Sequence, residues 1–220
     1  MEKLEVKLTE FAEQHAQEIQ NDPVFRSRFL QMCAPLGVDP LASKKSFWGK
    51  LLGMGDFYHE LAVKVAEVCL AARNRNGGIM SCAEVQSTLA QRKTRLGAAG
   101  NSKTNAVSVS DIQVAITKLA KLGGGFRTIQ VGSSTMIVSV PTELDNDHME
   151  VLTVAQMLET GIMVEDVQQA TSWGQDRVER ALELLLQQGM AWLDECKGET
   201  YYWFPSVWQE VIQDSSFLDA

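Results

Sequence analysis

The sequence has few of the residues that build metal sites and disulfide frameworks, and no segment that could cross a membrane. Its 220 residues include four cysteines and three histidines, and no two cysteines form a C-x-x-C pair. Scattered cysteines on apolar stretches are typical of buried, reduced thiols, so neither a disulfide framework nor a zinc site is expected. No apolar run approaches the ~20 residues of a membrane helix, and MEKLEVKLTE does not resemble a signal peptide. We therefore expect a cytoplasmic protein without metal or cofactor.

Motifs for nucleotide binding and catalysis are also missing. The stretch SFWGKLLGMGDF (46–57) is rich in glycine, but its spacing fits neither a P-loop nor a dinucleotide fingerprint. The carboxylate of Asp56, directly after Gly55, would repel a phosphate. Neither His59 nor His148 lies near a nucleophile motif such as G-x-S-x-G. We expect no catalytic residue, no enzyme activity and no small-molecule substrate.

The same stretch is better interpreted as a joint ahead of a helix. Apolar residues follow it at helical spacing: Phe57, Leu61, Val65, Val68, Cys69 and Ala72. Asp56 is then predicted as the N-cap of that helix. Phe47, Trp48 and Leu51 are predicted to act as wedges in the joint, where the glycines permit close approach of the backbone.

Charge is distributed unevenly along the chain. Residues 57–142 carry a net charge of +6 and residues 143–220 a net charge of −13, within a total of −8. A basic middle and a strongly acidic end are typical of separate domains that face different partners.

The N-terminal part is predicted to form a pair of amphipathic helices. The first covers about residues 1–20, and the second starts at NDPVF, where Asp22 can cap and Pro23 fits the first turn. The residues expected on the inner face of the second helix are Phe25, Phe29, Met32 and Cys33. Two short helices cannot bury both apolar faces alone, so they require another domain or another chain.

One order of elements then occurs twice. From Asp56 it runs helix, short strand at IM, helix, helix and hairpin, and from residue 143 the same order follows in less space. The inward residues of the two third helices are expected to be Ile112, Ile116, Leu119 and Leu122, and Val178, Leu182, Leu185 and Leu186. This order is that of a winged helix. The predicted fold is mainly α with small β-hairpins (α+β): an N-terminal helical region and joint (1–55) and two tandem winged-helix domains (56–142 and 143–220).

A winged helix often binds DNA, but the second one is too acidic to do so, since its charge would repel a duplex. For the first winged helix, the sequence leaves the role of the basic residues open. Its basic residues are Arg92, Lys93, Arg95, Lys103, Lys118, Lys121 and Arg127. They fit a solvated surface, a contact with an acidic protein or anionic membrane, or nucleic acid, although no aromatic residues interleave with them as in a single-strand binder.

The second hairpin is unusually aromatic. Trp192, Tyr201, Tyr202, Trp203 and Phe204 all lie in it. These side chains could fill the core of a small domain, or part of them could form an exposed groove for a proline-rich segment.

Several strings resemble one known family. EFAEQH…NDPVFRSRFLQMC, GVDPLAS…FWGKLLGMGDFYHELAVKVAEVC, RNGGIMS, SVPTEL and GMAWLD are similar to the winged-helix subunit of the ESCRT-II endosomal sorting complex, the partner of the GLUE-domain subunit. The likeness runs from about Leu8 to Phe204. It implies a non-enzymatic scaffold in a Y-shaped complex, in which this subunit and the GLUE-domain subunit each bind one copy of a small third subunit.

The resemblance also implies a place in the cell. The complex connects ESCRT-I with ESCRT-III on endosomes and sorts ubiquitinated membrane proteins into multivesicular bodies, so peripheral recruitment to the endosomal membrane is expected. Family members usually carry a longer, basic N-terminal segment that helps to bind membrane. Because this sequence starts within that helix, the resemblance does not extend to direct membrane binding. The rival hypothesis is a DNA-binding transcription regulator.

Two sets of partner-binding residues follow. In the family, a proline- and aromatic-containing segment of the third subunit inserts into the second winged helix, for which we expect Trp192, Asp194, Tyr202 and Trp203. Phe11, Phe25 and Phe29 are expected to face the GLUE-domain subunit.

Overall fold

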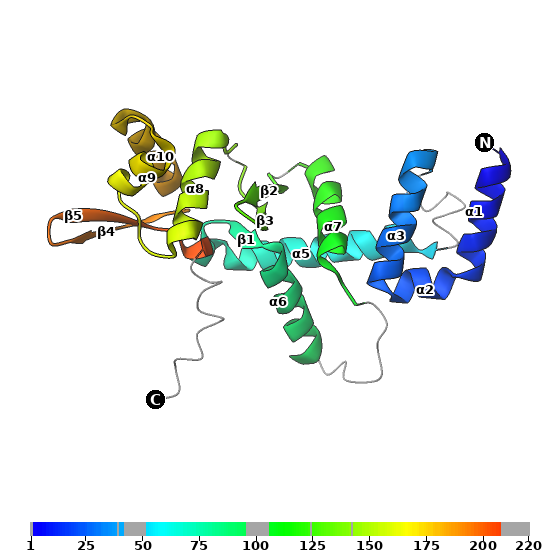
Figure 1. Ribbon diagram of the computed structural model, residues 1–220. Coiled ribbons are helices and arrows are strands. Elements are labelled where there is room, and N and C mark those ends of the chain that lie inside the picture. The colour runs from blue at the N-terminus through cyan, green and yellow to red at the C-terminus, as the bar shows by residue number, and fades with distance from the viewer. Residues whose placement is uncertain are drawn as a thin grey trace. The chain divides into compact units, whose positions relative to one another are not determined.

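The computed structural model describes residues 2–38, 40–41, 52–95, 106–123, 125–141 and 143–207. The predicted class is confirmed: the chain is mainly helical, with small antiparallel sheets. The elements up to the first wing are α1 (Glu2–Gln14), α2 (Ala16–Asn21), α3 (Pro23–Cys33), the 3-10 turn η1 (Ala34–Leu36), α5 (Met54–Asn76), β1 (Ile79–Ser81), α6 (Cys82–Arg95), α7 (Val109–Lys121), β2 (Arg127–Val131) and β3 (Ser134–Val138). The second repeat consists of α8 (Asn146–Leu158), α9 (Val164–Thr171), α10 (Gln175–Gln187), β4 (Trp192–Cys196) and β5 (Glu199–Trp203) (Figure 1).

The chain divides into two compact units. One contains residues 1–65 with 86–121, and the other contains residues 66–85 with 122–220, so α5 runs from the first unit into the second. The sheet of the first winged helix therefore belongs to the same unit as the whole second winged helix. The domain limits 1–55, 56–142 and 143–220 differ from these units and remain a prediction from the order of elements.

The first unit contains the N-terminal helices. Asp22 caps α3 as predicted, its carboxylate accepting hydrogen bonds from the N–H groups of Val24 (2.8 Å) and Phe25 (3.3 Å). The buried face of α3 is formed by Arg26, Phe29 and Cys33. Met32 was expected on that face but is 40% exposed, because it lies off the i, i+3, i+7 line of these three residues.

The start of α5 corrects the assignment of Asp56. The helix begins at Met54, directly after Gly53, whose φ of 59° only glycine adopts without strain. Asp56 is therefore not the N-cap but lies inside the first turn. Its carboxylate still interacts favourably with the positive end of the helix dipole. The stripe expected after it is confirmed for Leu61, Val65, Val68, Cys69 and Ala72, all buried, while Phe57 is only half-buried.

The first wing is part of a three-stranded antiparallel sheet. Its order is β1-β3-β2, with Met80 opposite Ile137 and Ile129 opposite Met136. The end of α7 differs from the prediction, because Leu122, expected inward, is 82% exposed. The helix ends at Lys121, one residue earlier, so Leu122 leaves its inner face.

The second repeat starts with a capping box. The Asp145 carboxylate accepts hydrogen bonds from the backbone of α8, and the His148 ring accepts one from the N–H of Asp145 (3.1 Å). A short antiparallel bridge between Ile162 and Tyr202 attaches β5 to the segment before α9. The inner faces of α8 and α10 form one apolar core together with β1, β2 and β3, so the first sheet and the second winged helix share their interior.

Within the second unit, two turns pack closely at a glycine. Gly77, in the turn after α5, lies directly against the backbone after α10, where an added Cβ would be 2.3 Å from the carbonyl oxygen of Gly189. Both residues have positive φ, 63° and 71°. A side chain at position 77 would therefore be strained and without space.

The four cysteines occupy two environments. Cys33, Cys69 and Cys82 are buried, whereas Cys196 is exposed at the end of β4. Burial raises the pKa of Cys69 to about 12 and that of Cys82 to about 11. None of the helices in the described ranges combines the length and the apolarity that crossing a bilayer requires.

Candidate protein-interaction surface

The second wing extends away from its own domain. β4 and β5 are joined by the two-residue turn Lys197–Gly198, and both turn residues have positive φ (53° and 87°). Two positive φ values in a two-residue loop are those of a type I′ turn, whose twist suits a hairpin. All five residues of β4 are exposed, and Figure 1 shows the hairpin reaching beyond α8, α9 and α10.

The register divides the side chains of the hairpin between two faces. Trp192 lies opposite Trp203 and Asp194 lies opposite Tyr201, so these four share one face. Leu193 opposite Tyr202 and Glu195 opposite Thr200 form the other face. Trp192, Asp194 and Trp203, expected in one binding surface, are thus brought together, and Tyr202 is not.

Trp203 packs against the backbone of its own domain, whereas Trp192 is exposed. An added Cβ at Gly161 would lie 2.7 Å from Cε2 of Trp203, so the indole rests on the backbone there. Trp192 is 55% exposed. An exposed aromatic side chain of this size offers a large apolar surface to a partner.

Tyr202 lies on the opposite face of the hairpin from Trp192 and Trp203. It packs against the apolar core, and burial raises its pKa, as do the negative charges of Glu179 and Glu183 on α10. Phe204 is also buried. Phe204 thus fills the core and Trp192 lies at the surface, and the groove for a proline-rich segment stays a prediction.

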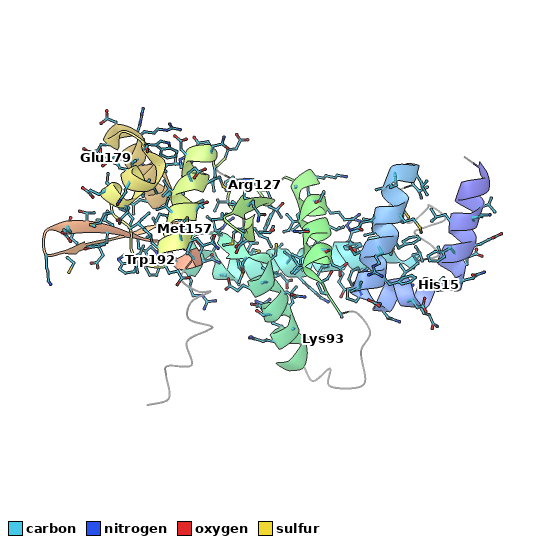
Figure 2. All side chains as sticks on the ribbon, viewed as in Figure 1. His15, Lys93, Arg127, Met157, Glu179 and Trp192 are labelled. Atoms are coloured by element: carbon cyan, nitrogen blue, oxygen red, sulfur yellow. The ribbon has the colours of Figure 1, made fainter. Side chains whose placement is uncertain are left out.

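Further apolar residues are exposed in the same domain, and the sequence did not predict them. Met157 (77% exposed) and Leu158 lie at the C-terminal end of α8, and Leu193 lies on β4. Figure 2 labels Met157 and Trp192, at the end of α8 and at the base of β4. The exposure of Met157 and Leu158 could have been predicted only from their positions in α8. Both fall outside its buried stripe, which is formed by Val151, Leu152, Val154 and Ala155.

The start of α10 is occupied by a local ion pair. Arg177 donates two hydrogen bonds, both 2.7 Å, to the carboxylate of Asp147, and its guanidinium stacks 4.1 Å above the ring of Trp173. The hydrogen bonds from Arg177 lower the pKa of Asp147. This arginine is therefore engaged within the domain.

The N-terminal phenylalanines form a cluster in the first unit. The Phe11 ring stacks on Phe25 and Phe29 with centroids 6.0 and 6.4 Å apart. Phe29 is buried within the chain's own helices, and Phe11 and Phe25 remain half-buried. Only the last two offer ring surface to a partner.

The predicted joint residues Phe47, Trp48 and Leu51 lie outside the described residues. The structure instead shows a buried polar network that joins the N-terminal helices to α5 and α7. Arg26 donates to both carboxylate oxygens of Asp111 (2.9 and 2.8 Å), and the Tyr58 hydroxyl donates to the same carboxylate (2.6 Å). The remaining Arg26 N–H groups reach the carbonyl oxygens of Gln20 and Ala106.

The network is fully enclosed. Arg26, Asp111 and Tyr58 are each at most 1% exposed. Burial alone would raise the pKa of Asp111, but the hydrogen bonds from Arg26 and Tyr58 outweigh it and lower that pKa. Burial likewise opposes the charge of Arg26, and its bonds to Asp111 reverse the effect and raise its pKa. The pair is therefore charged inside the protein, and removing either member would leave the other uncompensated.

No group of His, Cys, Asp and Glu in the described part of the chain is arranged to hold a metal ion. What the geometry presents is a two-repeat winged-helix protein with an exposed aromatic hairpin in an acidic domain. The model of the EAP30/Vps36 family matches residues 1–195, and the chain belongs to this family.

Relatives of known role cover nearly all of the chain. It is 45% identical over 203 residues to vacuolar protein sorting-associated protein 22 homolog 1 of Arabidopsis thaliana, covering 91% of this chain and 78% of the relative. It is 41% identical to the vacuolar-sorting protein SNF8 of Homo sapiens, covering 96% and 79%. Among solved structures it is similar to a chain of the endosomal complex ESCRT-II (VPS22/VPS25/VPS36), with a TM-score of 0.69, 29% identity and coverage of 94% and 90%. A second ESCRT-II structure gives a TM-score of 0.68 and 30% identity, with coverage of 93% and 89%.

These matches confirm the resemblance to the ESCRT-II subunit. They place the chain with vacuolar-sorting proteins and not with transcription regulators, so the rival hypothesis is wrong.

Proposed function

We propose that this chain is a scaffold subunit of an ESCRT-II complex and holds the position of VPS22. Its similarity to SNF8 and VPS22 proteins over more than nine-tenths of its length supports this. In that position it assembles with the GLUE-domain subunit VPS36 and the small subunit VPS25. The complex sorts ubiquitinated membrane proteins into multivesicular bodies, between ESCRT-I and ESCRT-III, and its recruitment from the cytoplasm to the endosomal surface is peripheral. The chain acts by assembly and not by catalysis.

The second winged helix is the proposed site for the small third subunit. The observation that carries this is the exposure of Trp192 beside the packed indole of Trp203. An exposed aromatic pair grips proline and aromatic side chains, and Asp194 on the same face can pair with a basic residue of the incoming segment. The net charge of −13 over residues 143–220 disfavours nucleic acid as an alternative partner.

The GLUE-domain subunit is proposed to contact the N-terminal helices. The exposed parts of Phe11 and Phe25 support this, together with the exposed side chains of Val6 and Val24. Phe29 supports the contact indirectly, since it fixes the ring of Phe11 from inside.

The test is reconstitution with the VPS36 and VPS25 homologues of the same organism. Native mass spectrometry should find one copy of this chain, one of VPS36 and two of VPS25. Calorimetry should find that Trp192→Ala weakens VPS25 binding roughly thirtyfold, the usual loss at an aromatic anchor.

Leu122→Ala is the matched control, because it removes an exposed apolar side chain from the first repeat, 82% exposed against 55% for Trp192. It should leave the affinity unchanged. Unaltered binding by Trp192→Ala, with the fold intact by circular dichroism, would contradict the assignment of this surface.

A further inference from the structure

The outer edge of β4 has a defined pattern of hydrogen-bonding groups. The N–H of Tyr202 donates to the carbonyl of Ile162 (2.8 Å), and the N–H of Ile162 donates to the carbonyl of Tyr202 (2.9 Å). Both backbone groups of Tyr202 therefore point away from β4. In an antiparallel pair, residues opposite each other alternate between bonded and non-bonded pairs. Leu193, opposite Tyr202, is thus in a non-bonded pair, and its N–H and C=O point away from β5.

The same alternation applies two residues further along. Glu195 opposite Thr200 is again a non-bonded pair, so Glu195 also directs its N–H and C=O to the outer edge. The turn agrees with this, because a two-residue loop closes on a bonded pair, here Cys196 and Glu199. Among the residues that the structure describes, β4 pairs with β5 alone. Two N–H and two C=O groups, spread over ~7 Å of strand, are therefore open.

This edge has only part of the usual protection against strand addition. Natural edge strands are short, carry charged residues (above all lysine) or proline, or are twisted by a bulge. The strand Trp192–Cys196 reads WLDEC, contains neither lysine nor proline, and pairs with β5 in unbroken register. Its charges are both negative, at Asp194 and Glu195. Two copies of this edge would therefore repel each other, while a basic strand would be attracted.

We infer that the outer edge of β4 accepts an extended segment of a partner protein as a third strand of the second wing. The segment carries apolar side chains at the two positions opposite Trp192 and Leu193, one on each face of the sheet, and basic side chains at the two positions opposite Asp194 and Glu195. Backbone hydrogen bonds supply affinity without sequence preference. The apolar residues Trp192 and Leu193 and the acidic residues Asp194 and Glu195 select the segment and set its register. The inference rests on the proposed function, since the segment belongs to the partner that binds this winged helix, represented in the test by the VPS25 homologue.

The first measurement is hydrogen exchange at single amides, in the free chain and in the reconstituted complex. The amides of Leu193 and Glu195 should exchange at least tenfold more slowly in the complex. The amide of Thr200, which points to the opposite edge of the same hairpin, should not change.

The second measurement uses matched proline variants. Glu195→Pro removes an outward N–H and no bond of the hairpin, so VPS25 affinity should fall roughly three- to tenfold, the effect of one lost hydrogen bond. Thr200→Pro makes the same change on the opposite edge and should bind normally. Glu195→Gln retains the N–H and removes the charge, and it should reduce the salt dependence of binding instead.

The outcomes are distinguishable. If VPS25 binds but the amides of Leu193 and Glu195 exchange freely and Glu195→Pro binds normally, the inference is overturned and the proposed function stands. Equal losses in both proline variants would place the effect in the hairpin itself and would also overturn the inference. A chain that binds no VPS25 overturns both, and a homodimer that Glu195→Pro dissociates replaces the partner strand with a second copy of this chain.

Discussion

The two wings are the same element in opposite surroundings. Each consists of two five-residue strands in an antiparallel hairpin. In the first, β3 lies between β1 and β2 and ends in three buried residues. In the second, β4 is exposed throughout and β5 is attached to its domain by one bridge.

The difference in burial follows from the sequences of the two wings. The strand STMIV continues into an apolar run that a shared core can bury, whereas WLDEC gives an apolar base and an acidic tip. The end of β3 therefore packs into the core of the second unit, whereas β4 remains exposed along its length.

The first repeat also contains a buried ion pair, between Asp111 and Arg26 of the N-terminal helices. The largest effect on stability is expected from breaking this pair. Arg26→Met should lower the free energy of unfolding by roughly 3–5 kcal/mol, because Asp111 would keep a buried, unpaired charge. Urea unfolding would measure this. Adding Asp111→Leu should recover part of the loss, and a double variant no more stable than the single one would contradict the ion-pair explanation.

The second prediction compares the wings directly. Met136→Ala in β3 removes a side chain that is 3% exposed in the shared core and should cost about 3 kcal/mol. Trp192→Ala in β4 should cost less than about 0.5 kcal/mol, as is usual for a surface substitution. Thermal and urea unfolding of both variants would test the contrast. Similar losses would mean that the second wing is as structural as the first.

The smallest expected effect is a loss of stability in acid, below the pH range in which the protein is ordinarily handled. The folded pKa of Asp111 lies below its ordinary value of 3.8, so its contribution to stability is complete above that value and is lost as the pH falls through the folded pKa. Wild type should therefore lose more stability than Asp111→Asn between about pH 4 and pH 2. Equal slopes for the two proteins in urea unfolding at these pH values would contradict a charged Asp111.

Much of the fold could be predicted because it depends on local patterns. The apolar stripes of α5 and α10, the cap at Asp22 and the turns at residues 132–133 and 197–198 all lie within a few residues of the elements they define. The errors lie at element ends. Leu122 and Asp56 were misplaced because helix limits depend on one or two residues, here Lys121 and Gly53.

The buried network could not be predicted in this way. Arg26 and Asp111 are 85 residues apart, and each alone has the pattern of an ordinary polar residue on a helix. The candidate surface was predicted in part. The surplus of aromatics indicated the hairpin, but only the register separates Trp192 and Trp203 from Tyr202.

The position of the cysteines has a practical consequence. Three thiols are enclosed and Cys196 stands at the tip of the second wing, beside the turn Lys197–Gly198. The native protein therefore carries its own attachment point for a maleimide dye or spin label, without mutagenesis. A probe there would report on wing movement and on the arrival of a partner. The same exposed thiol makes a reducing agent necessary during purification, because two chains could otherwise become linked through their wing tips.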